Sequence, residues 1–505
     1  MSELTYQIIA LVIYFVLMLL IGFMASRKVK TADSYFLADR KLSPFTAALS
    51  ANAADMSGWL LMGLPGAIYA AGLFEAWIAI GLTIGAWVNW KFVAPRLRVY
   101  SEIADDAITI PSFFSKRLGG DGRPMRIASS LVILVFFTFY VSSGMVAAGK
   151  FCESTFGWSY YTGMAIVGVI TLMYTLFGGF LAATWTDVAQ GLLMAAALIA
   201  VPVVAFFRFG GWSPIAEGID ASGVEDVLNL FKGIDDGAFM WIIALISTAA
   251  WGLGYFGQPH IIVRFLALRS AHEARVSRRF SLVWMLVTAA GAVVTALIGL
   301  YYYTTSGAKL ADAETVFLEL SKILFHPLVA GFVLAAVLAA IMSTMSSQLI
   351  VCSSALVEDL YDAKNRDTSV RVELIVSRVA VVVVAVCAAL LALDRDSAIL
   401  DLVAFSWAGF GAAFGPVVLL SLYWKKLTSA GAFAGLVSGA VVTFVWGSID
   451  ALHGVMYEIV PGFLVNLCVA IVVSLVTKQN NSSVDEQFER MTTQLARGEE
   501  DIKEL

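Results

Sequence analysis

Charged residues are scarce in this chain of 505 residues. Asp, Glu, Lys and Arg together make up 14% of it, and 59% is apolar. A soluble domain usually contains about 25% charged and about 45–50% apolar residues. The composition therefore excludes a soluble enzyme and a nucleic-acid-binding protein. The formal net charge of −5 also argues against a polyanionic partner.

Side chains that bind metals or form disulfides are few as well. The four cysteines are scattered, contain no Cys-x-x-Cys spacing, and predict neither a disulfide framework nor a metal site. The four histidines are expected near the ends of apolar stretches or in loops. They form no His-x-x-x-His motif and no Ser/His/Asp grouping, so no catalytic constellation is predicted.

Apolar stretches are what the chain has in abundance. A helix needs about 20 mostly apolar residues to cross a bilayer, and thirteen stretches qualify. They span residues 6–26, 43–70, 74–94, 127–149, 158–178, 186–207, 239–261, 280–303, 326–357, 372–393, 399–423, 427–447 and 456–477. The first stretch lacks a small-residue cleavage signal, which predicts a retained helix.

The basic residues predict the orientation of these spans. If each span reverses direction, 27 of the 33 Lys and Arg residues fall on one side of the membrane. Cytoplasmic loops carry such an excess, so we expect the N-terminus outside and the C-terminus inside. The acidic loop 208–238 is compatible with an external gate and with a solubilising cap. The polar tail 479–505 predicts a solvated, partly disordered end.

Asp55 is the most informative polar residue, because it lies well inside the second span (AANAADMSGWLLMGLPG). A carboxylate in mid-bilayer costs about 3 kcal/mol even on lenient scales, and such residues usually mark ion paths. It needs a cation or a hydrogen-bond donor as partner. The alternative is a structural Asp that joins two helices or caps a break. Ser57 and Gly58 favour a local break, which frees backbone carbonyls.

The seventh span contains a similar interruption (STAAWGLGYFGQPH). Three glycines loosen it, and Pro259 cannot donate to the carbonyl of Tyr255. Taken alone, this pattern is explained by close helix packing. However, spans 2 and 7 are five apart and each would open one of two five-helix halves of opposite orientation. Interruptions at matching positions of inverted repeats indicate the substrate and ion site of a secondary transporter.

A third polar cluster lies in span 9 (AAIMSTMSSQ). Ala340, Ser343 and Thr344 share one helix face at i, i+3 and i+4. Two hydroxyls and a carbonyl are hard oxygen ligands suited to a small cation. Hydrogen bonding to their own helix or to a neighbouring helix is the alternative.

These segments, with FGGFLAATWTDVAQGLLM at residues 177–194, resemble the sodium/solute symporter family, and most of all its sodium/proline symporters. The likeness covers the chain to about residue 478. It implies an all-α membrane protein of about 13 helices with a leucine-transporter-like 5+5 inverted-repeat core, one extra N-terminal helix and two extra C-terminal helices. The implied parts are 1–42 (first helix and cytoplasmic loop), 43–207 (first repeat), 208–238 (external loop), 239–423 (second repeat), 424–478 (last two spans) and 479–505 (cytoplasmic tail).

The resemblance also implies the site residues and a location in a bacterial inner membrane. Na⁺, the coupling ion, is expected between spans 2 and 9, bound by Ala53, Met56, Ala340, Ser343 and Thr344. Asp55 is expected to couple sodium, and Asp187 is a second candidate; for Asp187 the alternative is a plain acid at the cytoplasmic end of span 6.

Proline is the expected solute, a small zwitterion with an apolar ring. Its pocket would need an apolar wall and a few donors, with the carboxylate at a broken-helix N-terminus. The candidate substrate residues are Ser57, Trp59, Tyr140, Trp251, Tyr255, Phe256, Gln258 and Pro259; Tyr140 is chosen by resemblance only.

Four alternatives remain open at this point. The first is a symporter of another amino acid, sialic acid, pantothenate or a sugar. The second is proton coupling with Asp55 as the carrier, which the span 9 hydroxyls disfavour. The others are a channel and a membrane-embedded enzyme, for which no continuous polar pore and no catalytic group is evident. No obligate protein partner is expected.

Overall fold

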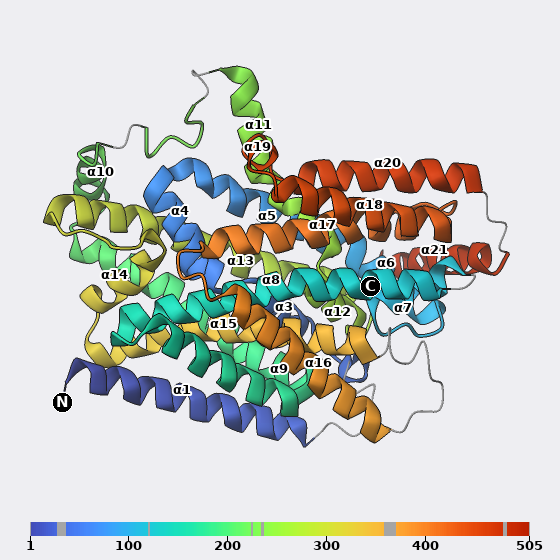
Figure 1. Ribbon diagram of the computed structural model, residues 1–505, viewed down its shortest axis with the longest axis horizontal. Coiled ribbons are helices and arrows are strands. Elements are labelled where there is room, and N and C mark those ends of the chain that lie inside the picture. Colours follow the sequence, from blue (N-terminus) through green and yellow to red (C-terminus); the bar gives the residue numbers. More distant parts are fainter. Residues whose placement is uncertain are drawn as a thin grey trace.

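The computed structural model describes residues 2–27, 37–119, 122–223, 226–233, 237–357, 370–477 and 482–503. These residues form helices packed side by side, with their long axes along the longest dimension of the molecule (Figure 1). The only strand-like pairing within those ranges is an isolated bridge between Leu42 and Leu268. Most of the expected first cytoplasmic loop, and three acids of the 208–238 loop (Glu225, Asp235 and Asp236), lie outside the described residues.

The first half of the chain contains α1 (Glu3–Ser26), η1 (Ala38–Arg40), α3 (Pro44–Asp55), η2 (Trp59–Gly63), α4 (Leu64–Ala71), η3 (Leu73–Glu75), α5 (Ala76–Val88), η4 (Asn89–Val93), α6 (Ala94–Ile103), α7 (Ile110–Leu118), α8 (Arg123–Phe156), α9 (Tyr160–Arg208) and α10 (Trp212–Asp220). The second half contains α11 (Ala238–Ala249), η6 (Ala250–Gly257), α12 (Pro259–Leu266), α13 (Glu273–Ser306), η7 (Ala313–Thr315), α14 (Val316–Leu324), α15 (Pro327–Ser354), α16 (Val370–Leu391), α17 (Ile399–Tyr423), α18 (Ser429–Gly447), α19 (Asp450–His453), α20 (Ile459–Thr477) and α21 (Ser482–Lys503).

Every predicted span coincides with an apolar helix. Among the described residues, ten helices are long and apolar enough to cross a membrane, and three shorter apolar helices cover Trp59–Ala71, Tyr160–Met173 and Arg378–Leu391. Predicted spans 5 and 6 are joined in α9, where Gly179 has φ 62° and separates two helical stretches. Glycine adopts this left-handed conformation without the penalty of a side chain.

One end of the bundle holds a cluster of partly buried charged residues. The Lys150 Nζ atom of α8 lies 2.7 Å from Glu314 and 3.0 Å from Asp312. The second carboxylate oxygen of Glu314 accepts hydrogen bonds from the backbone N–H groups of Ile399 (2.9 Å) and Leu400 (3.3 Å). A carboxylate at the first turn of a helix satisfies free N–H groups and stabilises the dipole. Glu314 therefore fixes α17 to α8.

The tail corrects one prediction. Residues 482–503 form the helix α21 at the opposite end of the bundle, beside α6 and α7 (Figure 1). Val484 and Met491 are buried, and the Phe488 ring packs against Tyr100. With Leu495 these residues recur at helical spacing, so the strongly polar composition concealed a narrow apolar stripe. The expectation of a partly disordered tail is therefore wrong for the described residues.

Candidate ion and substrate site

The second predicted span is broken beside its acid, as expected. Helix α3 ends at Asp55, Met56 adopts a non-helical conformation (φ −78°, ψ 78°), and the π-helical turn η2 begins at Trp59. Gly58 is required there, because a Cβ atom at this position would lie 2.9 Å from the Cβ of Ala147. The break turns the backbone at Asp55 away from helical hydrogen bonding.

The seventh predicted span is broken as well. Helix α11 passes into the 3₁₀ turns of η6, and α12 starts afresh with Pro259 in its first turn. Proline suits this position because the N–H it lacks would have no helical partner there. The carbonyl of Tyr255 instead accepts a hydrogen bond from Asn89 Nδ2 at 2.9 Å. The pair of interruptions predicted from the sequence is confirmed.

Oxygen atoms from α3 and α15 converge next to the first break. The Ser343 Oγ atom donates to the carbonyl of Ala53 at 2.7 Å and lies 3.2 Å from the carbonyl of Ala340. The Thr344 Oγ1 atom lies 3.4 Å from the same Ala53 oxygen. All four residues are buried. Met56, the fifth candidate ligand, is also buried and directly follows α3.

Asp55 joins both breaks to α8. Its Oδ2 atom accepts a short hydrogen bond from the Tyr255 hydroxyl, and its carbonyl accepts from Trp59 Nε1 (3.1 Å) and from the Tyr140 hydroxyl (3.3 Å). The Oδ1 atom is buried and has no hydrogen-bond partner among the described residues. Within the same ranges no cation pairs with this carboxylate, so a tyrosine is its side-chain donor.

Aromatic rings surround this carboxylate. The rings of Trp59 and Trp251 lie 6.2 Å apart, and Tyr255 packs edge-on to Trp407 at 5.1 Å. Trp251 also stacks on Tyr457 at 5.4 Å. Trp407 and Tyr457 were not predicted, because in apolar spans rich in aromatic residues no local pattern distinguishes them from packing residues.

The remaining candidate substrate residues are placed less directly. The Ser57 hydroxyl lies at the first break, 3.4 Å from the backbone N–H of Trp59. Gln258 uses its amide nitrogen to donate to the Trp407 carbonyl at 3.1 Å, whereas its Oε1 has no hydrogen-bond partner among the residues that the structure describes. Phe256 packs beside Gly415 of α17.

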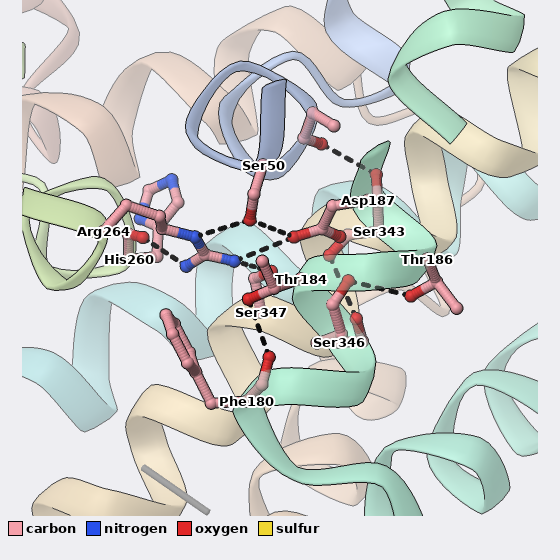
Figure 2. A network of polar contacts seen from close by, with 12 residues as sticks. Ser50, Phe180, Thr184, Thr186, Asp187, His260, Arg264, Ser343, Ser346 and Ser347 are labelled. Atoms are coloured by element: carbon pink, nitrogen blue, oxygen red, sulfur yellow. Dashed lines mark hydrogen bonds and ion pairs between the residues drawn. The ribbon is translucent and has the colours of Figure 1, made fainter. Parts of the chain in front are cut away.

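Asp187 belongs to a second buried network, shown in Figure 2. Its Oδ2 atom lies 3.0 Å from Arg264 Nη2 and accepts a hydrogen bond from Ser50 Oγ at 2.7 Å. Arg264 also donates to Ser50 (3.1 Å), to Ser347 (2.8 Å) and to the carbonyl of His260. The side chains of the ion pair are 1% and 0% exposed. Four helices, α3, α9, α12 and α15, meet in this network.

Sequence reasoning did not foresee that Arg264 and His260 are buried. We counted Arg264 among the cytoplasmic loop cations, but it is buried in α12 because Asp187 neutralises it there. His260, in the first turn of α12 and close to the end of the seventh predicted span, is fully buried, with its ring 5.4 Å from Phe137 and 5.8 Å from Tyr140. Both positions depend on helices far away in the sequence, so no local signal identifies them.

Comparison with known proteins now connects this geometry to a family. The model of the "Sodium:solute symporter family" matches residues 35–439. The chain belongs to the sodium:solute symporter family. It is 50% identical over 472 residues to the high-affinity proline transporter PutP of Bacillus subtilis, covering 93% of this chain and 98% of that protein. It is 48% identical over 489 residues to the sodium/proline symporter of Salmonella typhimurium, with 96% of both chains covered.

A solved structure shares the fold. The substrate-bound, outward-open structure of a Na⁺-coupled sialic acid symporter superimposes with a TM-score of 0.75, covering 93% of this chain and 98% of that one. Its sequence identity is 18%, so the likeness concerns the fold alone. The family, the fold and the two interrupted helices agree that this all-helical membrane protein is a transporter rather than an enzyme.

Proposed function

We propose that this protein imports L-proline together with Na⁺ across a bacterial inner membrane by alternating access. The names of its relatives supply the solute. The observation that carries the proposal is the group of oxygen atoms from Ala53, Ala340, Ser343 and Thr344 beside the break after Asp55. Carbonyl and hydroxyl oxygens are the hard ligands that Na⁺ prefers.

In this proposal Met56 supplies the fifth sodium ligand through its carbonyl, and Asp55 couples the ion to the solute. The Asp55 carboxylate lacks a cationic partner in the described part of the chain, and through Tyr255 it reaches the second broken helix. A bound Na⁺ would compensate its charge. Asp187 of α9 is the second candidate for sodium coupling; its partner Arg264 also contacts Ser347, one helical turn beyond Ser343 on α15.

Proline would lie between the two breaks. The rings of Trp59, Tyr140, Trp251 and Tyr255 form the apolar wall, and Pro259 and Phe256 flank it. The Ser57 hydroxyl and the N–H groups at the start of η2 suit the carboxylate. Gln258 offers its unpaired Oε1 to the ammonium group.

The finer architecture belongs to the same proposal. Thirteen crossings, with the N-terminus outside and a 5+5 inverted repeat over residues 43–207 and 239–423, bring α3–η2 and α11–η6–α12 to equivalent positions. The excess of basic residues expected on one side supports this orientation, even without the buried Arg264. In the transport cycle a membrane potential contributes about 2.3 kcal/mol per charge moved and per 100 mV, so Na⁺ entry can drive accumulation of the solute.

Uptake of radiolabelled proline by the purified protein in liposomes tests this proposal. An inward Na⁺ gradient should drive accumulation, whereas matched K⁺ and H⁺ gradients should not. The double variant Ser343→Ala/Thr344→Ala should abolish the accumulation of proline that the Na⁺ gradient drives, because it removes both hydroxyls. Ser306→Ala, which changes a hydroxyl at the far end of α13, should transport normally.

Two results would replace this proposal with its alternatives. If proline stays outside under every gradient, competition with other amino acids, sialic acid, pantothenate and sugars identifies the solute. If an H⁺ gradient alone drives uptake equally well, sodium is not the coupling ion and Asp55 becomes the proton carrier to test.

A further inference from the structure

A wide cavity lies at the end of the bundle where α6 and α21 meet, away from the proposed transport site. Its volume is about 1090 Å³. The elements η4 and α6, the segment 269–272, the start of α13, and the tail helix α21 form its walls. Its charged lining residues are Lys91, Arg96, Arg98, Glu102, Arg269, Arg275, Arg278 and Arg497. Seven cations therefore face one carboxylate.

Three of these cations have partners. Arg98 pairs with Glu102 at 2.8 Å, and Arg269 pairs with Glu273 at 2.8 Å. Arg96 donates to the Leu422 carbonyl at 3.1 Å and lies over the Tyr423 ring. These three hold the wall of the cavity together.

The other four cations have no anionic partner in the part of the chain that the structure describes. They are Lys91 of η4, Arg275 and Arg278 of α13, and Arg497 of α21. Arg275 and Arg278 are three residues apart on one helix, where like charges repel each other. A cavity that gathers unpaired cations from three elements has the charge to bind an anion.

The position of the cavity indicates where this anion comes from. The Lys91 Nζ atom lies 4.6 Å and 4.9 Å from the ring centres of Trp87 and Phe92, and both rings are 40% exposed. Exposed aromatic rings beside a basic residue are typical of the membrane interface. On α13 an exposed apolar strip begins one turn after Arg275, and it consists of Phe280, Val283, Leu286 and Val287. The basic cavity thus adjoins an apolar surface that is suited to acyl chains.

We propose that this cavity binds the phosphate headgroup of an anionic phospholipid, with an acyl chain along the strip of α13. Basic pockets between helices on the cytoplasmic side bind such headgroups. The adjoining apolar strip would not contribute to binding a free phosphate or a soluble nucleotide. Because Arg497 belongs to α21, the bound lipid also fastens the tail helix to α13. The proposal does not depend on which solute or ion the protein transports.

The test is the thermal stability of the purified full-length protein in a neutral detergent, with lipid retention followed by native mass spectrometry. The additions are phosphatidylglycerol, phosphatidylcholine and inorganic phosphate. We expect phosphatidylglycerol alone to raise the melting temperature and to stay bound. The pocket variant Arg275→Gln/Arg278→Gln/Arg497→Gln should lose most of this rise and retain less phosphatidylglycerol.

The matched control is Lys41→Gln/Lys426→Gln/Arg490→Gln. It removes the same charge from three exposed residues that do not line the cavity, one of them on the same tail helix. The control should respond like the wild type. If the pocket variant does not fold, Lys91→Gln/Arg497→Gln replaces it, because both side chains are exposed.

Three results would overturn the proposal. Equal stabilisation by phosphatidylcholine would show that the headgroup charge is not recognised. Equal stabilisation by inorganic phosphate would assign the cavity to a soluble anion. An equal loss of response in the pocket variant and the control variant would show that only the overall charge matters.

Discussion

Asp55 and Asp187 are both buried, and their surroundings differ. Asp187 is neutralised by Arg264 and receives a further hydrogen bond from Ser50. Asp55 accepts a side-chain hydrogen bond from Tyr255 and lacks a cationic partner within the described ranges. A buried carboxylate without a countercharge is costly, so Asp55 fits a site that a mobile cation completes. Asp187 fits a fixed connection between four helices.

The same contrast extends to the helices that carry these acids. Asp187 lies in the continuous second stretch of α9, whereas Asp55 is the last residue of α3 before a break. Carbonyls that are freed at a break can turn to a ligand, but those inside a helix cannot. The comparison teaches that the two buried acids differ in two respects, the broken backbone and the missing countercharge, and the proposed sodium site is at the acid that has both.

The largest effect is expected when the paired acid loses its cation. Arg264→Gln leaves Asp187 as an unpaired buried charge, which typically costs about 3–5 kcal/mol. We expect a strongly lowered melting temperature and little transport. The double variant Asp187→Asn/Arg264→Gln should recover part of the stability, because no charge is left behind. If the double variant is no more stable than Arg264→Gln, the charge of Asp187 is not what Arg264 compensates. Arg490→Gln, which changes an exposed arginine, serves as the control.

Neutralising the unpaired acid should affect transport and spare the fold. Asp55→Asn removes a charge that costs about 3 kcal/mol in a membrane interior, so the melting temperature should stay equal or rise. The sodium affinity should fall about 10- to 100-fold, since interactions with a charged group contribute about 1.5–3 kcal/mol. The measurement is the Na⁺ dependence of proline uptake beside a melting curve. A fall in stability as large as that of Asp187→Asn would contradict this difference.

Removing the donor to Asp55 should have an intermediate effect. Tyr255→Phe deletes the hydroxyl that donates to Asp55 Oδ2, and an unsatisfied buried acceptor costs about 1–3 kcal/mol. We expect slower uptake and a moderately lower melting temperature. In an Asp55→Asn background, Tyr255→Phe should lower the melting temperature by a smaller amount. Tyr161→Phe is the control, because Tyr161 is half exposed and its hydroxyl makes only a 3.4 Å contact with Leu393. Equal effects of Tyr255→Phe and Tyr161→Phe would exclude a special role for Tyr255.

The smallest effect concerns an exposed ion pair of the tail. Lys425 lies 2.8 Å from Glu489 and lowers the pKa of that carboxyl below its usual value of 4.5. The pair therefore contributes stability above pH 4.5 and loses it as the pH falls through the lowered pKa. Melting curves should show the wild type slightly more stable than Glu489→Gln at pH 6, and this difference should shrink as the pH is lowered below 4.5. A difference that stays constant with pH would mean that the charge of Glu489 does not matter.

Much of the fold could be predicted from local patterns in the sequence. All thirteen apolar stretches coincide with helices, because burial in lipid requires an apolar surface along the whole length of a helix. Both breaks were predicted from Asp55 with its neighbouring Ser and Gly, and from the glycines before Pro259. Ser343 and Thr344 lie opposite Ala53, as the family resemblance implied.

The tail and the charge network could not be predicted in this way. The apolar stripe of Val484, Phe488 and Met491 is too narrow to stand out in a polar segment, and its meaning depends on the groove that α6 and α7 offer. Arg264 resembles any loop cation in the sequence, because only the three-dimensional arrangement brings Asp187 to it.

By itself the sequence determined which segments form apolar helices and where two of them break, since hydrophobicity and backbone chemistry act locally. Only the tertiary structure decided which acid is neutralised, which cations remain unpaired at the α13–α21 cavity, and which aromatic rings surround Asp55. Those properties depend on contacts between residues far apart in the sequence, such as Tyr255 and Asp55, which are 200 positions apart. Coulomb attraction and hydrogen bonding act over a few ångströms in space, irrespective of distance along the chain.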